Sequence, residues 1–155
     1  MVKLVLNSLH GNQNKNNNFA LPLQISEGNI MKQIKKEFID KSGHDLAQVC
    51  ANAGLDTKAE DIVILDVRGL TTFTEYFVVM NGRSTRHVQA LAEAIEGKLR
   101  SKRVKASTAE GLQEGMWVLL DFDDVVVHIF YHEQRKFYDI EGLWSEAKQL
   151  EVEEA

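Results

Sequence analysis

The sequence predicts a single α/β domain, a mixed five-stranded sheet flanked by helices. The strongest observation lies in residues 115–144, where two apolar runs, 117–122 and 125–131, are separated only by Asp123 and Asp124. Both runs are rich in β-branched and aromatic residues, so we expect an antiparallel hairpin. Neither run alternates between apolar and polar residues, which is typical of strands covered on both faces. The hairpin therefore belongs in the middle of the sheet, between layers of helix.

The first half of the domain shows a helix followed by two strands. Residues Leu46, Val49, Cys50 and Ala53 have the spacing of one apolar helix face, and Gly54 is expected to end that helix as a left-handed cap. Residues 61–67 then form a short apolar run that predicts a strand. A second run begins at residue 74 and is expected to stop at residues 81–82, an Asn-Gly pair.

The second half begins with another helix, for which Ser84 is a suitable N-cap. Its apolar residues keep helical spacing from Val88 to Leu99, and Gly97 weakens it by about 1 kcal/mol relative to alanine. Residues 103–109 predict a short strand before the hairpin. A last helix is expected to carry four apolar residues on one face: Ile140, Leu143, Trp144 and Ala147.

The amino-terminal region differs in composition from the rest. Residues 7–29 contain seven asparagines, the only proline and no apolar period. We therefore expect residues 1–30 to be a disordered Asn-rich extension, residues 31–150 to form the domain and residues 151–155 to be an acidic tail. Met31 is either the true initiator or the practical start of structure.

Charge and cysteine content limit the possible partners and compartments. The net charge is −5, and residues 59–155 carry 18 acidic against 11 basic side chains. An acidic domain argues against free nucleic acid, because phosphate binding depends on Lys and Arg; a basic protein is the easier partner. A single cysteine, no long apolar segment, no signal-peptide pattern and no arginine before Arg68 together predict a cytoplasmic protein.

The sequence also offers an enzymatic interpretation. Asp121 and Asp123, with the turn at residues 82–84 that reads Gly-Arg-Ser, suggest a nucleotidyltransferase that holds magnesium ions. In that chemistry the turn and the carboxylates lie on neighbouring strands a dozen or so residues apart, whereas Gly82 and Asp121 are 39 positions apart with an additional strand between them. A turn-stabilising role for these acids is therefore preferred, and the enzyme is kept as an alternative.

No cofactor or metal ion is expected. His128 and His132 do not share a helix face, and no further ligands complete a metal shell. His128 is instead expected to be a buried ring hydrogen-bonded to the backbone or to an acid. Cys50 lies on an apolar helix face without a local base, so it is expected in the core.

Recognition of a protein surface is the second reading. Acids at strand ends and turns alternate with aromatic residues, a mixture that suits a basic partner, because Tyr and Trp supply most contact energy while acids steer and orient. Trp144 is expected in the core, since it lies on the apolar face of the last helix. Trp117 is left open between core and interface.

Taken in order, residues 59–99, 110–130 and 135–144 resemble the ribosomal silencing factor family, also called Iojap-related. The resemblance runs from about residue 45 to residue 147, about two thirds of the chain. It implies a fold related to nucleotidyltransferases without their active site, and no catalysis. The chain departs from the family pattern at Lys136, Phe137 and Gly142.

The resemblance also implies a partner and a mechanism. Such proteins bind the large ribosomal subunit through ribosomal protein uL-fourteen, block joining of the small subunit and lower translation under nutrient limitation. A homodimer of the free protein and a role in large-subunit biogenesis through the same surface both remain open. By motif position, the expected contact residues are Asp66, Tyr76, Trp117, Asp121, Asp124, Tyr138 and Asp139.

Overall fold

A computed structural model describes residues 42–155, so the expectations for residues 1–30 and for a start at Met31 lie outside the described part of the chain. The described elements are α3 (Gly43–Asp56), β1 (Glu60–Asp66), β2 (Tyr76–Gly82), α4 (Thr85–Ser101), β3 (Thr108–Glu110), β4 (Trp117–Asp121), β5 (Val125–Tyr131), α5 (His132–Tyr138), α6 (Ile140–Leu143) and β6 (Lys148–Leu150).

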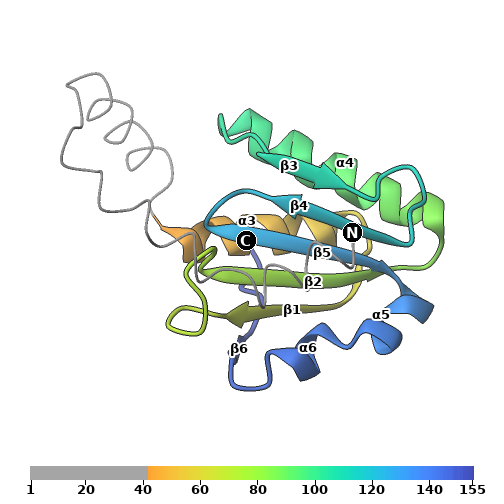
Figure 1. The fold of residues 1–155 in the computed structure, drawn as a ribbon. Coiled ribbons are helices and arrows are strands. Elements are labelled where there is room, and N and C mark those ends of the chain that lie inside the picture. Colours follow the sequence, from red (N-terminus) through yellow and green to blue (C-terminus); the bar gives the residue numbers. More distant parts are fainter. Residues whose placement is uncertain (1–41) are drawn as a thin grey trace.

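The strands form one mixed sheet in the order β3-β4-β5-β2-β1-β6 (Figure 1). Among the strands of residues 42–155, only the central pair, β2 and β5, is parallel. The predicted hairpin is confirmed as β4 and β5, and β5 lies in the interior of the sheet. The predicted number of strands was wrong, because β6 pairs with β1 as a sixth. Its three residues, Lys-Gln-Leu, are too short and too polar to show a strand pattern.

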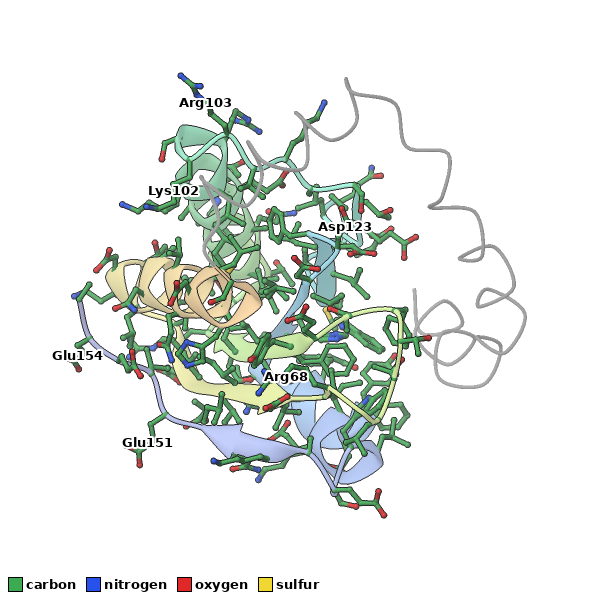
Figure 2. The ribbon with its side chains drawn as sticks, turned by 90° about the vertical axis from the view of Figure 1, so that its left-hand side faces the viewer. Arg68, Lys102, Arg103, Asp123, Glu151 and Glu154 are labelled. Atoms are coloured by element: carbon green, nitrogen blue, oxygen red, sulfur yellow. The ribbon has the colours of Figure 1, made fainter. Side chains whose placement is uncertain are left out.

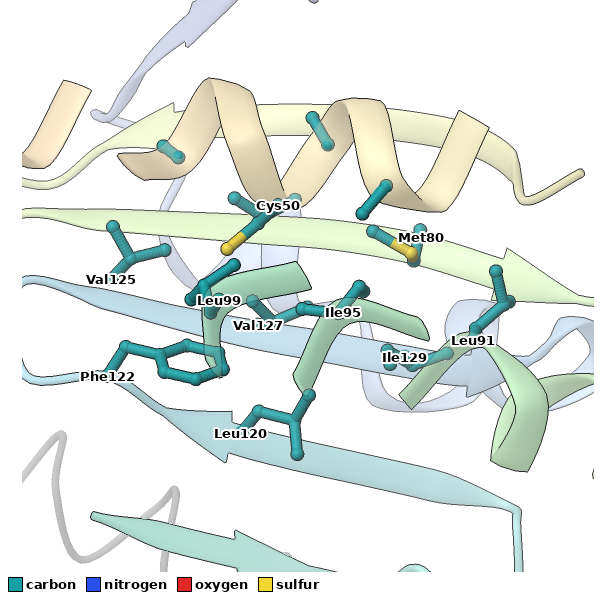
Figure 3. Close-up of a cluster of buried hydrophobic side chains, with 14 of the residues drawn as sticks. Cys50, Met80, Leu91, Ile95, Leu99, Leu120, Phe122, Val125, Val127 and Ile129 are labelled. Atoms are coloured by element: carbon teal, nitrogen blue, oxygen red, sulfur yellow. The ribbon is translucent and has the colours of Figure 1, made fainter. Parts of the chain in front are cut away.

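Helices α3 and α4 cover one face of the sheet. Their apolar sides pack on side chains of β2, β4 and β5, including Met80, Leu120 and Ile129 (Figure 3). Cys50 is fully buried in this layer, as its place on the helix face predicted. We call this layer the first core.

The opposite face is covered by α6, the turn after it and the loop before β2. Ile140 and Trp144 pack there on Phe77, Trp117 and other apolar residues of the sheet. This layer, the second core, confirms that both faces of the hairpin are covered and that Trp144 is a core residue.

The helix starts were easier to predict than the helix ends. Ser84 caps α4, since its hydroxyl oxygen accepts a hydrogen bond from the backbone N–H of His87 at 3.0 Å. Gly54, however, does not end α3, which continues to Asp56. This glycine lies buried within the helix because Met80 packs against it: an added Cβ would lie 2.7 Å from the Met80 Cε.

The last predicted helix is two short helices. Asp139 adopts a left-handed conformation with φ of 44°, which ends α5, and its side chain then accepts a hydrogen bond from the Gly142 N–H at the start of α6. Ile140 and Trp144 are buried as their spacing predicted, whereas Leu143 is 53% exposed. The single-helix expectation was therefore wrong from Trp144 onward, where the chain turns into β6.

Residues 151–155 lie along α3. The Gln48 side-chain amide donates to the carbonyl of Glu151 and accepts from the N–H of Glu153, at 3.1 and 2.8 Å. Asn52, one turn later, pairs in the same way with Glu153 and Ala155. Two amide side chains thus hold alternate residues of an extended segment. Among the helices that the structure describes, none is both long and apolar enough to cross a membrane.

Candidate functional site

The seven expected contact residues fall into two groups at opposite ends of the sheet. At one end of β5, Val125 and Val126 lie beside Tyr76 and Asp121, while at the other end Phe130 pairs with Trp117. Five residues of strand separate the two ends, about 17 Å at the usual rise per residue. Asp66, Tyr76, Asp121 and Asp124 form the first group, and Trp117, Tyr138 and Asp139 form the second.

In the first group, Asp66 and Tyr76 are linked through Arg68. The Arg68 guanidinium donates two hydrogen bonds to the Asp66 carboxylate, at 3.0 and 2.7 Å, and lies 5.2 Å from the centre of the Tyr76 ring. The bonds from Arg68 lower the pKa of Asp66. The Tyr76 side chain is only 2% exposed, and burial raises the pKa of its hydroxyl. Tyr76 is therefore part of the first core and offers a partner almost no contact area.

Asp121 and Asp124 organise the hairpin turn. The Asp121 carboxylate accepts a hydrogen bond from the backbone N–H of Asp123 at 2.9 Å, and Asp123 has a left-handed φ of 70°. The Asp124 carbonyl accepts from the N–H groups of Glu75 and Tyr76. The Asp121 contact fits the turn-stabilising role, whereas Asp124 takes part through its backbone carbonyl and not through its carboxylate.

The nucleotidyltransferase constellation is not assembled. Gly82 pairs with Tyr131 at one end of β5, whereas Asp121 pairs with Val126 near the other end. The Gly-Arg-Ser turn and the two carboxylates therefore lie at opposite ends of the sheet. Within residues 42–155, no group of three or more His, Cys, Asp or Glu side chains is placed to hold a metal ion.

Trp117 is a buried residue of the second core, with 3% of its surface exposed. Its indole N–H donates to the Nδ1 of His128 at 3.1 Å. Its ring stacks on Phe130 at 4.9 Å and lies 4.6 Å from the ring of Tyr138, both measured between centroids. Trp117, which the sequence left open between core and interface, is therefore a core residue, and its ring packs against the inner side of Tyr138.

His128 is buried, as expected, but its partner is an indole rather than the backbone or an acid. Because Nδ1 accepts the Trp117 hydrogen bond, the neutral ring carries its proton on Nε2, which has no hydrogen-bond partner among the described residues. The Phe77 ring meets His128 edge-on at 5.0 Å. Burial lowers the pKa of His128 to about 3, so the ring stays neutral in the folded protein.

Large apolar side chains exposed near the second group were missed by the sequence reasoning. Phe137 is 78% exposed, Leu143 is 53% exposed and Met116 is 36% exposed. Phe137 lies 5.0 Å from the Tyr138 ring, and Met116 directly precedes Trp117. We call the surface formed by Phe137, Tyr138, Asp139 and Leu143 the α5–α6 surface. In the sequence, Phe137 differs from the family pattern. Its exposure follows from α5 being a short helix with little buried area.

Arg135 anchors this surface to the sheet. It is 8% exposed and donates to the Asn81 side chain at 3.1 Å, to the Asp61 carbonyl and to both carboxylate oxygens of Glu141. It therefore ties α5 to the ends of β1 and β2 and to α6. No sequence pattern marked this residue, since a buried arginine is recognised only from the groups that surround it.

Comparison with known proteins shows the family to which the chain belongs. Residues 40–155 match the family model described as "Ribosomal silencing factor during starvation". The chain is 35% identical over 112 residues to the ribosomal silencing factor RsfS of Halalkalibacterium halodurans, covering 72% of this chain and 96% of that protein. It is also 30% identical over 90 residues to a Mus musculus protein named mitochondrial assembly of ribosomal large subunit protein 1, covering 56% of this chain and 40% of that protein. A crystal structure of a Chromobacterium violaceum protein superposes with a TM-score of 0.66 at 34% identity, over 74% of this chain and 94% of that one.

Proposed function

Because the chain belongs to the ribosomal silencing factor family, we propose that it binds the large ribosomal subunit through ribosomal protein uL-fourteen and blocks joining of the small subunit. The proposal includes repression of translation in the cytoplasm under nutrient limitation. It assigns the protein no catalytic step, in keeping with the separation of the Gly-Arg-Ser turn from Asp121 and Asp123.

The observation that carries the proposal is the α5–α6 surface. It presents two large apolar side chains, Phe137 and Leu143, beside the exposed carboxylate of Asp139. Exposed aromatic and aliphatic groups supply contact energy at protein interfaces, and acids at the rim favour a basic partner. The acidic balance of residues 59–155 adds the same preference over longer range.

The seven contact residues predicted from the motifs take different roles in this proposal. Tyr138 and Asp139 contact the partner directly, and Trp117 holds Tyr138 in place from the core. Asp121 and Asp124 lie at the far end of the sheet and contribute through the acidic balance of the domain. Asp66, at the same end, is paired with Arg68 and holds that side chain. The Tyr76 ring packs against the Arg68 guanidinium.

Blocking requires no chemistry. A protein bound to a surface that the small subunit also needs excludes that subunit by mass action, in proportion to its concentration over its dissociation constant. The same exposed apolar groups would be covered by a second copy in the free protein, so we include a homodimer that dissociates on ribosome binding. Light scattering of the free protein, with and without the substitution Phe137→Ser, measures that equilibrium.

The test of the main proposal is co-sedimentation with purified large subunits, followed by addition of small subunits. The wild-type protein is expected to sediment with large subunits and reduce the fraction of joined ribosomes. Phe137→Ser and Leu143→Ser are each expected to weaken binding at least tenfold, the effect of losing about 1.4 kcal/mol of contact energy.

Leu70→Ser provides the matched control. Leu70 is also exposed, at 40%, but lies in the loop between β1 and β2, away from the α5–α6 surface. All three variants should keep the wild-type melting temperature. Equal weakening by all three, or no sedimentation of the wild-type protein with large subunits, would contradict the proposal.

A role in assembly of the large subunit is the second candidate, favoured by the name of the mouse relative. The two functions differ in what the added protein does. An assembly factor leaves joining of mature subunits unchanged in the purified system, while immature large subunits accumulate in cells that lack it. The silencing function predicts inhibition of joining with mature subunits alone.

A further inference from the structure

Five basic side chains gather at the carboxyl end of α4 and in the turn after it. They are Lys98, Arg100, Lys102, Arg103 and Lys105, which we call the basic corner, and all five are exposed. Figure 2 shows Lys102 and Arg103 pointing away from the domain at the end of this helix. None of the five forms an ion pair with another residue in the described part of the chain.

The basic corner contrasts with the rest of the domain. No acidic residue occurs between residues 97 and 109, whereas the remainder of residues 59–155 carries 18 acids against six basic side chains. The low overall basic content argued against nucleic acid as a partner unless the cations were concentrated in one place. The structure shows such a concentration at one end of one helix.

Helix stabilisation does not require five cations here. A basic residue in the last turn interacts favourably with the helix dipole, but that effect falls off within one turn, and Lys98 and Arg100 already occupy it. Lys102, Arg103 and Lys105 lie beyond the last helical residue. They add like charge to the same small region, which costs stability unless a negative partner is present.

Arg103 has a left-handed backbone. Its φ is 63°, and the N–H groups of Arg103 and Val104 bond to the carbonyls of Arg100 and Leu99, the pattern of a Schellman cap. This position favours glycine, and a side chain here strains the backbone. Lys58 takes the same position after α3, with φ of 69°, so the conformation alone assigns no role to the guanidinium. It does make Arg103→Gly a substitution that removes the charge without straining the fold.

We propose that the basic corner binds the phosphate backbone of RNA. Its five exposed cations span the helix end and the following turn, so they can contact several phosphates of one strand or of neighbouring strands. The choice of RNA rests on the proposed function, since a protein bound to the large ribosomal subunit is surrounded by ribosomal RNA. The corner would then be a second attachment point, distinct from the α5–α6 surface that contacts protein.

An anionic membrane is the competing partner for a basic surface, and the corner lacks what membrane binding needs. A peripheral helix inserts apolar side chains beside its cations. Here the large apolar residues of the segment, Leu99 and Val104, pack against the first core: Leu99 is fully buried and Val104 is half-buried.

The expected binding is weak and strongly dependent on salt. Each phosphate neutralised in a duplex contributes about −0.9 to the slope of log affinity against log salt concentration. Five contacts give a slope of about −4.5, a loss of roughly 500-fold in affinity between 50 and 200 mM salt. Such contacts alone reach micromolar affinity at best. Once the α5–α6 surface has bound its protein partner, however, binding of the basic corner to nearby RNA is intramolecular, and the two contacts reinforce each other.

The experiment titrates a fluorescent 20-base-pair RNA duplex with the full-length protein at several salt concentrations and follows anisotropy. The double variant Lys102→Ala/Arg103→Gly removes two of the five cations and relieves the strained backbone. With three cations left, we expect a shallower slope of about −2.7 and weaker binding at 50 mM salt. Its melting temperature should equal or exceed that of the wild type.

The matched control is Lys136→Ala/Lys148→Ala, which removes two exposed cations outside the basic corner. This control should keep the wild-type affinity and slope. Equal weakening by both double variants, absence of RNA binding by the wild type at 50 mM salt, or binding to vesicles containing 30% phosphatidylserine in preference to the duplex would overturn the proposal.

A separate measurement distinguishes this inference from the proposed function. Binding to purified ribosomal protein uL-fourteen, free of RNA, should be unchanged in the Lys102→Ala/Arg103→Gly variant and weakened at least tenfold in Phe137→Ser. If the wild-type protein binds RNA but does not bind uL-fourteen, the proposal for the basic corner stands and only the silencing proposal is refuted.

Discussion

Replacing Trp117 tests whether this tryptophan belongs to the core. The side chain is 3% exposed, stacks on Phe130 and donates a hydrogen bond to His128. Trp117→Ala leaves a cavity in the second core, and large aromatic-to-alanine changes of this kind cost about 3–5 kcal/mol. For a domain of this size we expect the melting temperature to fall by roughly 12–20 °C.

The variant Trp117→Phe separates packing from the hydrogen bond. Phenylalanine keeps most of the apolar contact but removes the N–H, so the Nδ1 of His128 is left buried without a donor. That unpaired acceptor costs about 1–3 kcal/mol. In the double variant Trp117→Phe/His128→Leu the acceptor is gone, and the combined loss should be smaller than the sum of the two single losses.

Differential scanning calorimetry gives the melting temperature of each variant. Binding to large subunits is then measured below that temperature. An unchanged melting temperature in Trp117→Ala, together with lost binding, would refute the assignment to the core and place the tryptophan at the interface.

Four further substitutions test the packing at two glycines, the contact between Gln48 and residues 151–155, and the buried histidine. Gly97→Ala should raise the free energy of unfolding by about 0.5–1 kcal/mol in denaturant titrations, because an added Cβ meets no atom within 4 Å. Gly115→Ala should lower the free energy of unfolding by more than about 2 kcal/mol in the same titrations. The backbone of Gly115 has φ of 66°, and an added Cβ would lie 2.6 Å from a carbonyl oxygen. Gln48→Ala should speed amide hydrogen exchange in residues 151–155, while the free energy of unfolding falls by only about 1 kcal/mol. Unchanged exchange would show that the position of residues 151–155 does not depend on this amide. The buried His128, with a pKa near 3, is neutral in the folded chain but takes up a proton in the unfolded chain below about pH 6.5. Stability should therefore fall as the pH drops from about 6.5 toward 3, and His128→Leu should flatten that part of the curve in pH-dependent thermal melts.

The central hairpin and the helix starts were predictable because local patterns determine them. The two apolar runs on either side of Asp123 and Asp124 are joined by a tight turn and pair with each other, and Ser84 caps α4 through its own side chain. The helix ends were not predictable in the same way. Gly54 looked like a cap, but contact with Met80, far away in the sequence, decides its role.

The candidate site was predicted only in part, for a similar reason. Motif position identified Tyr138 and Asp139, which are accessible, together with Trp117 and Tyr76, which are buried. An aromatic residue beside an acid looks the same in sequence whether it faces a partner or the core. Phe137 and Arg135 were missed because exposure of the first and burial of the second depend on how α5 lies against the sheet.

The buried residues around α5 explain why a helix of seven residues can serve as a binding surface. Such a helix is too short to be stable alone. Arg135 fixes it to β1, β2 and α6 from one side, and the contact between Trp117 and Tyr138 fixes it from the other. The backbone at Phe137 is therefore held in place before a partner arrives, and less backbone conformational entropy is lost on binding. It follows that Arg135→Met should weaken large-subunit binding even though Arg135 is buried, and that Phe137→Ser should do so without changing stability. If binding survives in Arg135→Met while hydrogen exchange shows α5 released from the sheet, then preorganisation of this helix is not what makes the α5–α6 surface bind.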